Sequence, residues 1–222
     1  MTVPARPTAA VLALLGAFLA AGAVPAWAAS ARAPVAAALN ADDRAEIGRV
    51  EQYMNGIQTM QSKFIQVNPN GQQIFGTFSL SRPGKMRLDY DPPIKDFIVA
   101  DGLFLFYWDG EMRQQSSTPI GATLADFILR PDIRLSGDVT VTDVTRGSGV
   151  IEITVVETKE PAKGSLTLVF EDKPLQLRKW RVLDAQGQVT EVGLLNPRVG
   201  LSLDRDMFYF KEPARERFNH QN

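Results

Sequence analysis

The sequence predicts a mainly β domain, α+β by helix content, whose single antiparallel sheet is strongly curved or forms an incomplete barrel. Three observations lead to this fold class. Short segments alternate apolar with polar residues, turn residues separate these segments at hairpin spacing, and no helices alternate with the strands. A parallel sheet needs crossover helices and is therefore excluded. About eleven strands and two helical segments account for the pattern.

Length and composition fit one well-packed domain. The chain has 222 residues, 45% of them hydrophobic, and no shift in composition marks a second domain. A net charge of −1 and an isoelectric point near 5.9 remove the electrostatic reason to expect nucleic acid or an anionic membrane surface as a partner. The absence of cysteine excludes a disulfide, a thiolate metal site, a thiol nucleophile and a lipidated N-terminal cysteine.

The N-terminus has the features of a cleavable export signal. Arg6 precedes an apolar run over residues 9–24, and the sequence Ala-Trp-Ala that ends at Ala28 suits a signal peptidase. A membrane anchor is the alternative, but the run is short for a span and contains two glycines. We expect cleavage after Ala28. The predicted division is a signal peptide over residues 1–28, a flexible tail over 29–41, a folded domain over 42–213 and a C-terminal tail over 214–222.

Asp42 or Asp43 should cap the first helix, since helix starts favour carboxylates. Apolar residues then recur at steps of three and four and form one stripe. These residues are Ile47, Val50, Met54, Ile57 and Met60. The stripe fits ordinary core packing and the lining of a ligand cavity equally well.

Five strands should follow in a meander of hairpins. They are residues 62–67, 72–82, 85–90, 97–100 and 103–108, joined by turns rich in Asn, Pro, Gly and Asp. In the second and third strands, Phe78 and Leu80, and then Met86, Leu88 and Tyr90, alternate with polar residues, so one face is apolar. The strand over 103–108 is apolar on both faces. We expect it to be covered on both sides, or to face something apolar outside the chain.

A second helix should begin at Thr118-Pro119, with Thr as cap and Pro in the first turn, and end before Pro131. Leu124, Phe127, Ile128 and Leu129 make it mostly apolar. It could be a movable lid, or it could close one end of the core.

The second half of the chain is a run of strands punctuated by turn residues. The predicted strands are residues 139–145, 150–157, 165–170, 175–183, 188–195 and 207–210.

Signatures of catalysis are missing. The single histidine, His220, lies in a polar tail, and the chain has no Gly-x-Ser-x-Gly elbow, His-Glu-x-x-His motif, phosphate-binding glycine loop or dinucleotide fingerprint. Glu152 and Glu191 occupy strand positions where a solvated face is the simplest role. Asp204 and Asp206 have the spacing of metal ligands, but no further ligands follow, so a turn explains them better. We expect no enzymatic activity, no metal and no cofactor.

What remains is a surplus of apolar side chains, which could line the concave side of a curved sheet beneath the second helix. Such a container would suit acyl chains, because each buried methylene contributes about 0.8 kcal/mol. Core filling is the alternative for each residue. The candidates are Phe78, Leu80, Met86, Leu88, Phe97, Val99, Leu105, Tyr107, Leu124, Phe127, Ile128, Leu166, Leu168, Phe170 and Trp180.

The chain resembles the LolA family of periplasmic lipoprotein carriers in three segments, residues 82–90, 98–102 and 105–109. The shared pattern is a strand ending in Arg-Pro, a short turn, a return strand, and then a hydrophobic strand, Asp-Gly and an aromatic strand. It extends over residues 42–213 as a pattern of spacing. The chain departs from it at Met86 and Leu88, where family members commonly have aromatic residues.

The resemblance implies an unclosed half-barrel covered by an N-terminal helix and a short lid helix, in a periplasmic, monomeric protein without cofactors. Its partners would be acylated lipoproteins, an inner-membrane ABC transporter of the Lol type and an outer-membrane acceptor of the LolB type. The chain itself differs from LolB, because it has no cysteine for lipidation. The alternative function is a lipid or lipoprotein sensor of the RseB type.

Arg82 is the last candidate site residue. By alternation its side chain points to the same side as Phe78 and Leu80. A buried guanidinium needs acceptors, and the free carbonyls at the end of a lid helix would supply them. The resemblance implies that these bonds hold the lid closed. A solvated arginine at a strand end is the alternative.

Overall fold

In the computed structural model, residues 35–214 are described. They form one antiparallel sheet of eleven strands in the order β6-β5-β4-β3-β2-β1-β11-β10-β9-β8-β7. The strands are β1 Thr59–Val67, β2 Gln73–Ser81, β3 Lys85–Tyr90, β4 Phe97–Asp101, β5 Phe104–Asp109, β6 Gln114–Pro119, β7 Val139–Gly147, β8 Val150–Glu157, β9 Gly164–Asp172, β10 Leu175–Asp184 and β11 Val189–Val199. The helical segments are α2 Ala41–Gly56, α3 Ala125–Leu129 and the 3₁₀ turns η1 Ile120–Ala122, η2 Pro161–Lys163 and η3 Arg205–Phe208.

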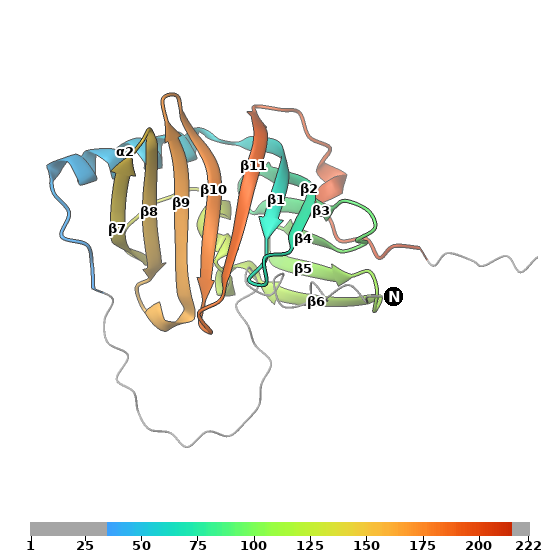
Figure 1. Cartoon of the computed structure of the whole chain (residues 1–222). Coiled ribbons are helices and arrows are strands. Elements are labelled where there is room, and N and C mark those ends of the chain that lie inside the picture. Colours follow the sequence, from blue (N-terminus) through green and yellow to red (C-terminus); the bar gives the residue numbers. More distant parts are fainter. Residues whose placement is uncertain (1–34, 215–222) are drawn as a thin grey trace, which may run out of the picture.

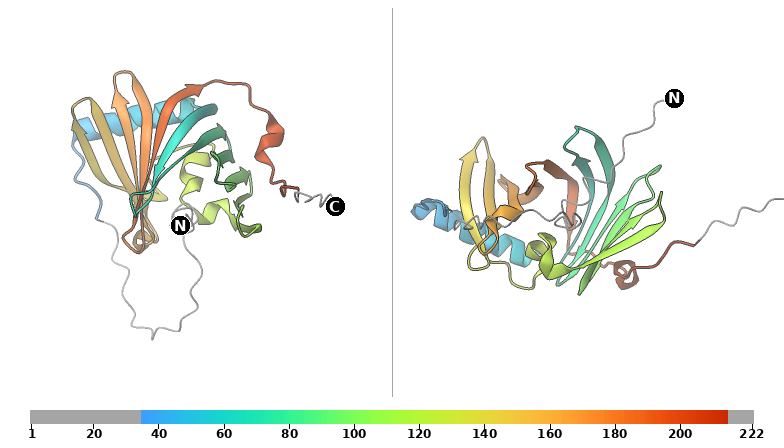
Figure 2. Two further views of the ribbon diagram at one scale, coloured as in Figure 1. Left: turned by 45° about the vertical axis from the view of Figure 1, so that its right-hand side comes forward. Right: turned by 90° about the horizontal axis from the view of Figure 1, so that it is seen from below.

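The sheet is strongly curved and does not close, as the sequence predicts. Its two edge strands, β6 and β7, are not paired with each other. Seen from below in Figure 2, the strands follow a U-shaped path, and α2 and α3 lie across its open side. Figure 1 shows the two halves of the sheet, β7–β11 and β1–β6, meeting at the pairing of β1 with β11.

Helix α2 begins slightly earlier than the sequence suggests. Asn40 is its N-cap, and Asp43 closes a capping box by accepting from the backbone N–H of Asn40. Val50 and Met54 are buried on the helix, whereas Ile57 and Met60 are buried beyond its C-terminal end. The apolar stripe is therefore real, but its last two members belong to the turn and to β1.

Two segments differ from the sequence prediction in type. Thr118-Pro119 ends strand β6 and does not start a helix; η1 and α3 follow it. Residues 207–210 are not a strand, because η3 occupies Arg205–Phe208. Asp204 caps η3 by accepting from the N–H of Asp206, so these two carboxylates form a turn, as expected.

The outer face of the first half of the sheet carries a separate aromatic cluster. Phe210, from the C-terminal segment, stacks on Phe97 and Phe106 and lies beside Trp108. The prediction that the strand over residues 103–108 is covered on both faces holds only at Phe106 and Trp108, where the chain's own C-terminal segment packs on the outer face. Leu103 and Phe104 are exposed.

A buried pair of side chains ties β5 to the loop before β4. The Tyr107 hydroxyl donates to Asp96 Oδ2 at 2.8 Å, and Asp96 Oδ1 accepts from the backbone N–H of Gly110 at 2.9 Å. Burial and the neighbouring Asp96 carboxylate raise the pKa of Tyr107 well above its ordinary value.

The predicted signal peptide and its cleavage site lie outside the described residues. Of the predicted tail over 29–41, Ala37 donates to the carbonyl of Val141 on the edge strand β7, Asn40 caps α2, and Ala41 is helical.

Candidate functional site

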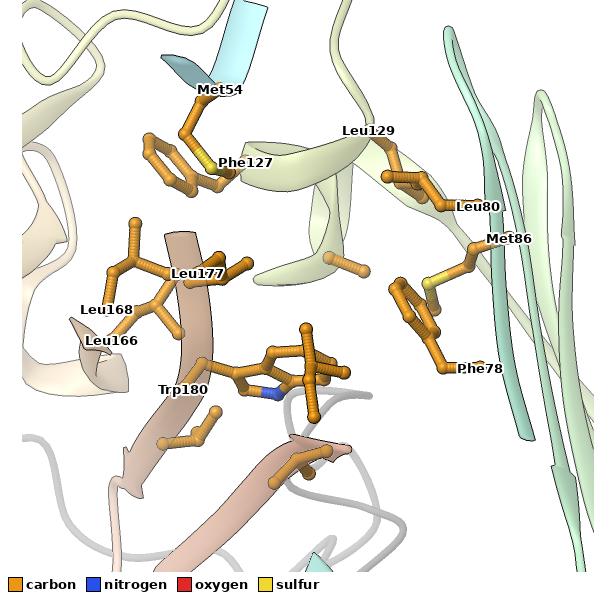
Figure 3. Packing of buried hydrophobic residues seen from close by; sticks show 14 of the residues in the cluster. Met54, Phe78, Leu80, Met86, Phe127, Leu129, Leu166, Leu168, Leu177 and Trp180 are labelled. Atoms are coloured by element: carbon orange, nitrogen blue, oxygen red, sulfur yellow. The ribbon is translucent and has the colours of Figure 1, made fainter. Parts of the chain in front are cut away.

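The concave face of the sheet and the two α-helices enclose one large hydrophobic cluster. All the apolar site candidates except Phe97 and Val99 belong to it or pack against it. They are Phe78, Leu80, Met86, Leu88, Leu105, Tyr107, Leu124, Phe127, Ile128, Leu166, Leu168, Phe170 and Trp180. Figure 3 shows this packing: on α3, Phe127 lies toward Met54, whereas Leu129 lies toward Leu80.

Phe97 and Val99 were wrongly expected on the concave face. In the register of β3 with β4, Ile98 pairs with Leu88 and Ala100 pairs with Met86, so Ile98 and Ala100 face the core. Phe97 and Val99 lie in the outer aromatic cluster with Trp108. Because every residue from Phe97 to Ala100 is apolar, alternation along β4 cannot decide which face points inward. The cross-strand register decides it.

A small apolar cavity, which we call the inner cavity, lies where α3, the end of α2 and the sheet meet. We call α3 and its C-cap Arg130 the lid, after the role that the resemblance predicts for this helix. The free volume of the inner cavity is about 20 Å³, roughly the space that one water molecule needs. The lining residues are Met54, Ile57, Met60, Phe78, Leu80, Arg82, Ile128, Leu177 and Trp180. The walls of the inner cavity are therefore apolar apart from Arg82.

Leu177 is a wall residue that simple alternation misses. Along a regular strand, Leu177 and Trp180 would face opposite sides of the sheet, yet both line the inner cavity. The pairing of β10 with β9 shifts register between Leu177 and Lys179. This bulge turns both side chains inward.

Arg82 points into the same site and binds both helix ends. Nη1 donates to the carbonyls of Met54 at 2.5 Å and Ile57 at 3.2 Å, at the end of α2. Nε and Nη2 donate to the carbonyl of Arg130 at 3.2 and 2.7 Å, and Nη2 also reaches the carbonyl of Pro131 at 3.2 Å. The carbonyls of Arg130 and Pro131 lie just beyond the C-terminal end of α3, where intrahelical donors are lacking, and the guanidinium satisfies them. At Met54 it adds a second donor to a carbonyl that also accepts from the N–H of Ile57 at 3.2 Å.

Arg82 is buried, and no carboxylate among the described residues forms an ion pair with it. Its hydrogen bonds end on backbone carbonyls and on Asn55 Oδ1. Burial lowers the pKa of Arg82 below its ordinary value, and the charge of Asp132 partly opposes this. Arginine nevertheless stays protonated in proteins. The Arg82 side chain thus points inward, as alternation predicts. It does not reach solvent as an arginine at a strand end would.

The turn that carries Arg82 holds the lid through its backbone as well. Gly84 donates its N–H to the carbonyl of Leu129 at 2.8 Å. Gly84 has a φ of 81° and lies so close to Gly102 that an added Cβ would come within 2.9 Å of its Cα. A side chain at Gly84 would therefore strain the turn and clash with the backbone of Gly102.

Asn55 fastens the segment after the lid to α2. Its Nδ2 donates to the carbonyl of Ile133 at 2.9 Å, and its Oδ1 accepts from the N–H of Ile133 at 2.8 Å. Glu51, one turn earlier, accepts from the N–H of Leu135 at 2.6 Å. Sequence reasoning does not identify Asn55 or Glu51, because both look like ordinary solvent-facing helix residues.

The described part of the chain offers no arrangement for metal chemistry: it has no group of three or more His, Asp or Glu side chains placed to hold an ion. No helix among residues 35–214 is long and apolar enough to cross a membrane. Glu152 and Glu191, the strand carboxylates, pair with Arg181 on the sheet. Their role is that of surface ion pairs.

Comparison with known proteins identifies, along most of the chain, the family that the sequence resembles. The model described as "Outer membrane lipoprotein carrier protein LolA" matches residues 55–211. Among solved structures, a LolA superfamily protein from Nitrosomonas europaea is similar over 74% of this chain and 97% of its own, with 9% identity and a TM-score of 0.39.

Three curated relatives are each named outer-membrane lipoprotein carrier protein. The relative from Methylococcus capsulatus is 28% identical over 174 residues, which are 75% of this chain and 83% of the relative. The relative from Legionella pneumophila (strain Corby) is 29% identical, covering 72% and 82% of the two chains. The relative from Pseudomonas aeruginosa (strain UCBPP-PA14) is 26% identical, covering 78% and 87%. Proteins of this family are periplasmic carriers and not enzymes. Because the family model covers well over half of its length, the chain belongs to the LolA family of outer-membrane lipoprotein carriers.

Proposed function

We propose that this protein binds the acyl chains of lipoproteins beneath its lid and carries them through the periplasm from the inner to the outer membrane. The observation that carries the proposal is the inner cavity, an almost wholly apolar site that is closed by α3 and fastened by Arg82. The family membership supplies the class of cargo.

The cavity as it stands is too small for this cargo. A free volume of about 20 Å³ cannot hold an alkyl chain, so binding requires α3 to move away from Phe78, Leu80 and Trp180. Each methylene that then leaves water contributes about 0.8 kcal/mol. A chain of a dozen or more carbons can therefore offset the loss of the contacts that hold the lid.

Arg82 would set the balance between the empty and the loaded states. Its hydrogen bonds to Met54 and Arg130 exist only while both helix ends stay together. They stabilise the closed, empty protein and oppose the open, loaded one. An inner-membrane ABC transporter of the Lol type would open the lid during loading, and an outer-membrane acceptor would receive the acyl chains when the lid closes again.

Depletion of the protein in its own organism tests this function. We expect lipoproteins to accumulate in the inner membrane and the envelope to become stressed. The measurement is separation of the two membranes followed by quantification of lipoproteins in each. A normal amount of lipoprotein in the outer membrane, in a strain without a second carrier, would contradict the proposal.

A further inference from the structure

A second pocket lies on the flank of the lid, outside the inner cavity. We call it the flank pocket. Its volume is about 210 Å³, several times the roughly 30 Å³ that a water molecule occupies in the liquid. Its apolar walls come from the lid and from strands β7–β9, and its polar rim comes from the neighbouring loops. The apolar lining residues are Leu124, Phe127, Val139, Val155, Val156 and Leu166.

The lid contributes to the walls of both the flank pocket and the inner cavity. Phe127 lines the flank pocket, and the next residue, Ile128, lines the inner cavity. Both side chains pack against the same hydrophobic cluster. An alkyl chain in the flank pocket would therefore need only a displacement of Phe127 and Ile128 to continue into the inner cavity.

Arg130 joins the flank pocket to the contacts that hold the lid closed. Its backbone carbonyl accepts two hydrogen bonds from Arg82, while its side chain lines the pocket and pairs with Asp126 and Asp138. A molecule that moves Arg130 to enter the pocket strains the bonds to Arg82. Entry and release of the lid are thus energetically linked.

Arg130 also carries an unused hydrogen-bond donor, which is covered in this structure and becomes accessible only when the side chain moves. Arg130 Nε is buried and donates to no acceptor among the residues that the structure describes. Buried donors are normally satisfied, and a carbonyl oxygen at the head of an alkyl chain would satisfy this one. An acyl ester or amide has that carbonyl directly beside its chain. The pocket therefore combines an apolar wall with a donor suited to an acyl carbonyl.

From this arrangement we propose that the flank pocket is the entry site for the first acyl chain of the cargo, with the chain against Phe127, Val155 and Leu166 and its carbonyl on Arg130 Nε. The inference rests on the proposed carrier function and adds the route by which cargo enters. Occupation of the pocket precedes release of the Arg82 contacts and weakens them.

Gly121 allows a direct test, because it lines the flank pocket and a Cβ placed on it would meet no heavy atom within 4 Å. Gly121→Phe therefore adds a bulky side chain to the pocket lining at a position where the backbone accepts a Cβ. Gly147→Phe is the matched control: Gly147 also has open space, lies at the end of β7 and is not among the pocket residues. The probe is a dodecanoyl glycerol ester with a photoreactive diazirine at the end of its chain.

We expect the probe to label residues 121–130 and 155–166 of the wild-type protein and of Gly147→Phe. In Gly121→Phe, binding should weaken about tenfold, the loss expected when about two methylene groups stay in water. The rate of lipoprotein capture should fall to a similar degree, while the final amount bound stays at the wild-type level. Labelling confined to β2 and β10, with unchanged affinity in Gly121→Phe, would overturn the entry site.

A second comparison isolates the proposed hydrogen bond. Arg130→Met removes the side chain but keeps the backbone carbonyl that Arg82 binds. The wild-type protein should prefer the ester probe over the matching ether, which lacks the carbonyl, and Arg130→Met should lose this preference. An equal preference in both proteins would overturn the role of Arg130. Failure of the wild-type protein to retain lipoprotein, with the pocket still labelled, would contradict the carrier function alone.

Discussion

The guanidinium of Arg82 donates two hydrogen bonds to the backbone carbonyl of Arg130, from Nε at 3.2 Å and from Nη2 at 2.7 Å. Arg82 thereby connects the end of strand β2 to the end of the lid. The same guanidinium binds the last turn of α2 through Met54. One side chain thus joins the sheet and both helices that close the open side of the half-barrel.

Replacement of Arg82 by leucine should leave loading intact and slow release. The closed, empty protein loses its charge-assisted hydrogen bonds, each contributing roughly 1.5–3 kcal/mol, whereas the open, loaded protein loses little. We expect transfer of bound lipoprotein to an acceptor to slow about tenfold or more, as even one such bond implies. A purified transfer assay measures it.

Arg87→Leu is the control for that variant, because Arg87 lies on the outer face of β3 and pairs with Asp89. It should transfer at the wild-type rate. Transfer at the wild-type rate by Arg82→Leu itself would mean that the contacts of Arg82 do not govern the lid.

Phe127→Glu should reduce retention of acylated cargo without unfolding the sheet. Phe127 is only 4% exposed, so the introduced carboxylate would favour a displaced lid over a closed one. Phe104→Glu is the control, since Phe104 is 42% exposed on the other face of β5. Cargo retention and circular dichroism are measured together. Global unfolding of Phe127→Glu would assign Phe127 to the main core and remove the support for a movable lid.

Gly76→Ala should destabilise the fold by about 1–3 kcal/mol, the usual cost of overpacking. A Cβ at Gly76 would lie 2.3 Å from the Asp89 carbonyl oxygen and 2.6 Å from the ring of Phe64, and both belong to neighbouring strands. Gly48→Ala is the opposite case, because Gly48 lies within α2 and a Cβ added there would meet no neighbouring heavy atom within 4 Å. This variant should stabilise the fold by roughly 0.5–1 kcal/mol. Urea unfolding gives both values. Equal stability of the two variants would contradict the packing described.

Tyr107 should make the protein sensitive to alkaline pH. Its pKa is raised in the folded state, so the folded protein holds the phenol proton more tightly than the unfolded chain does. The resulting contribution of Tyr107 to the free energy of unfolding is fully present below the unfolded pKa of about 10. It is lost as the pH rises from there through the higher pKa of the folded state. The free energy of unfolding should therefore fall less between about pH 9 and 11 in Tyr107→Phe than in the wild-type protein.

The control for the pH experiment is Tyr209→Phe, because Tyr209 is 47% exposed near the C-terminal end of the domain. Its alkaline profile should match that of the wild-type protein. A profile of Tyr107→Phe that also matches would show that ionisation of Tyr107 does not limit stability at high pH.

Much of the fold is predictable because the sheet is a meander. Alternation places Phe78, Leu80, Met86 and Leu88 on one face, and the structure has them there. Where a strand is apolar throughout, as in β4, the inward face depends on pairing with β3, which periodicity along one strand does not contain. On β10, the bulge at Leu177 likewise makes the inward-facing side chains unpredictable from alternation alone.

The helical segments are less predictable from local signals. Thr118-Pro119 looks like a helix start, yet it pairs with β5 as the end of β6. The inward direction of Arg82 follows from parity with Leu80, but its acceptors come from segments far along the chain, at Met54 and Arg130. Tertiary contacts of this kind leave no pattern in the sequence around Arg82.

The central claim is that the lid covers a site for the acyl chains of lipoproteins. Mass spectrometry of the protein purified from its own periplasm, without detergent, tests it most directly. We predict a population with one bound acylated lipoprotein, larger in Arg82→Leu than in the wild-type protein, because the empty closed state is then less stable. Purification of the wild-type protein and of Arg82→Leu entirely without lipoprotein, together with capture of a transmembrane regulator, would contradict the claim and indicate a sensor.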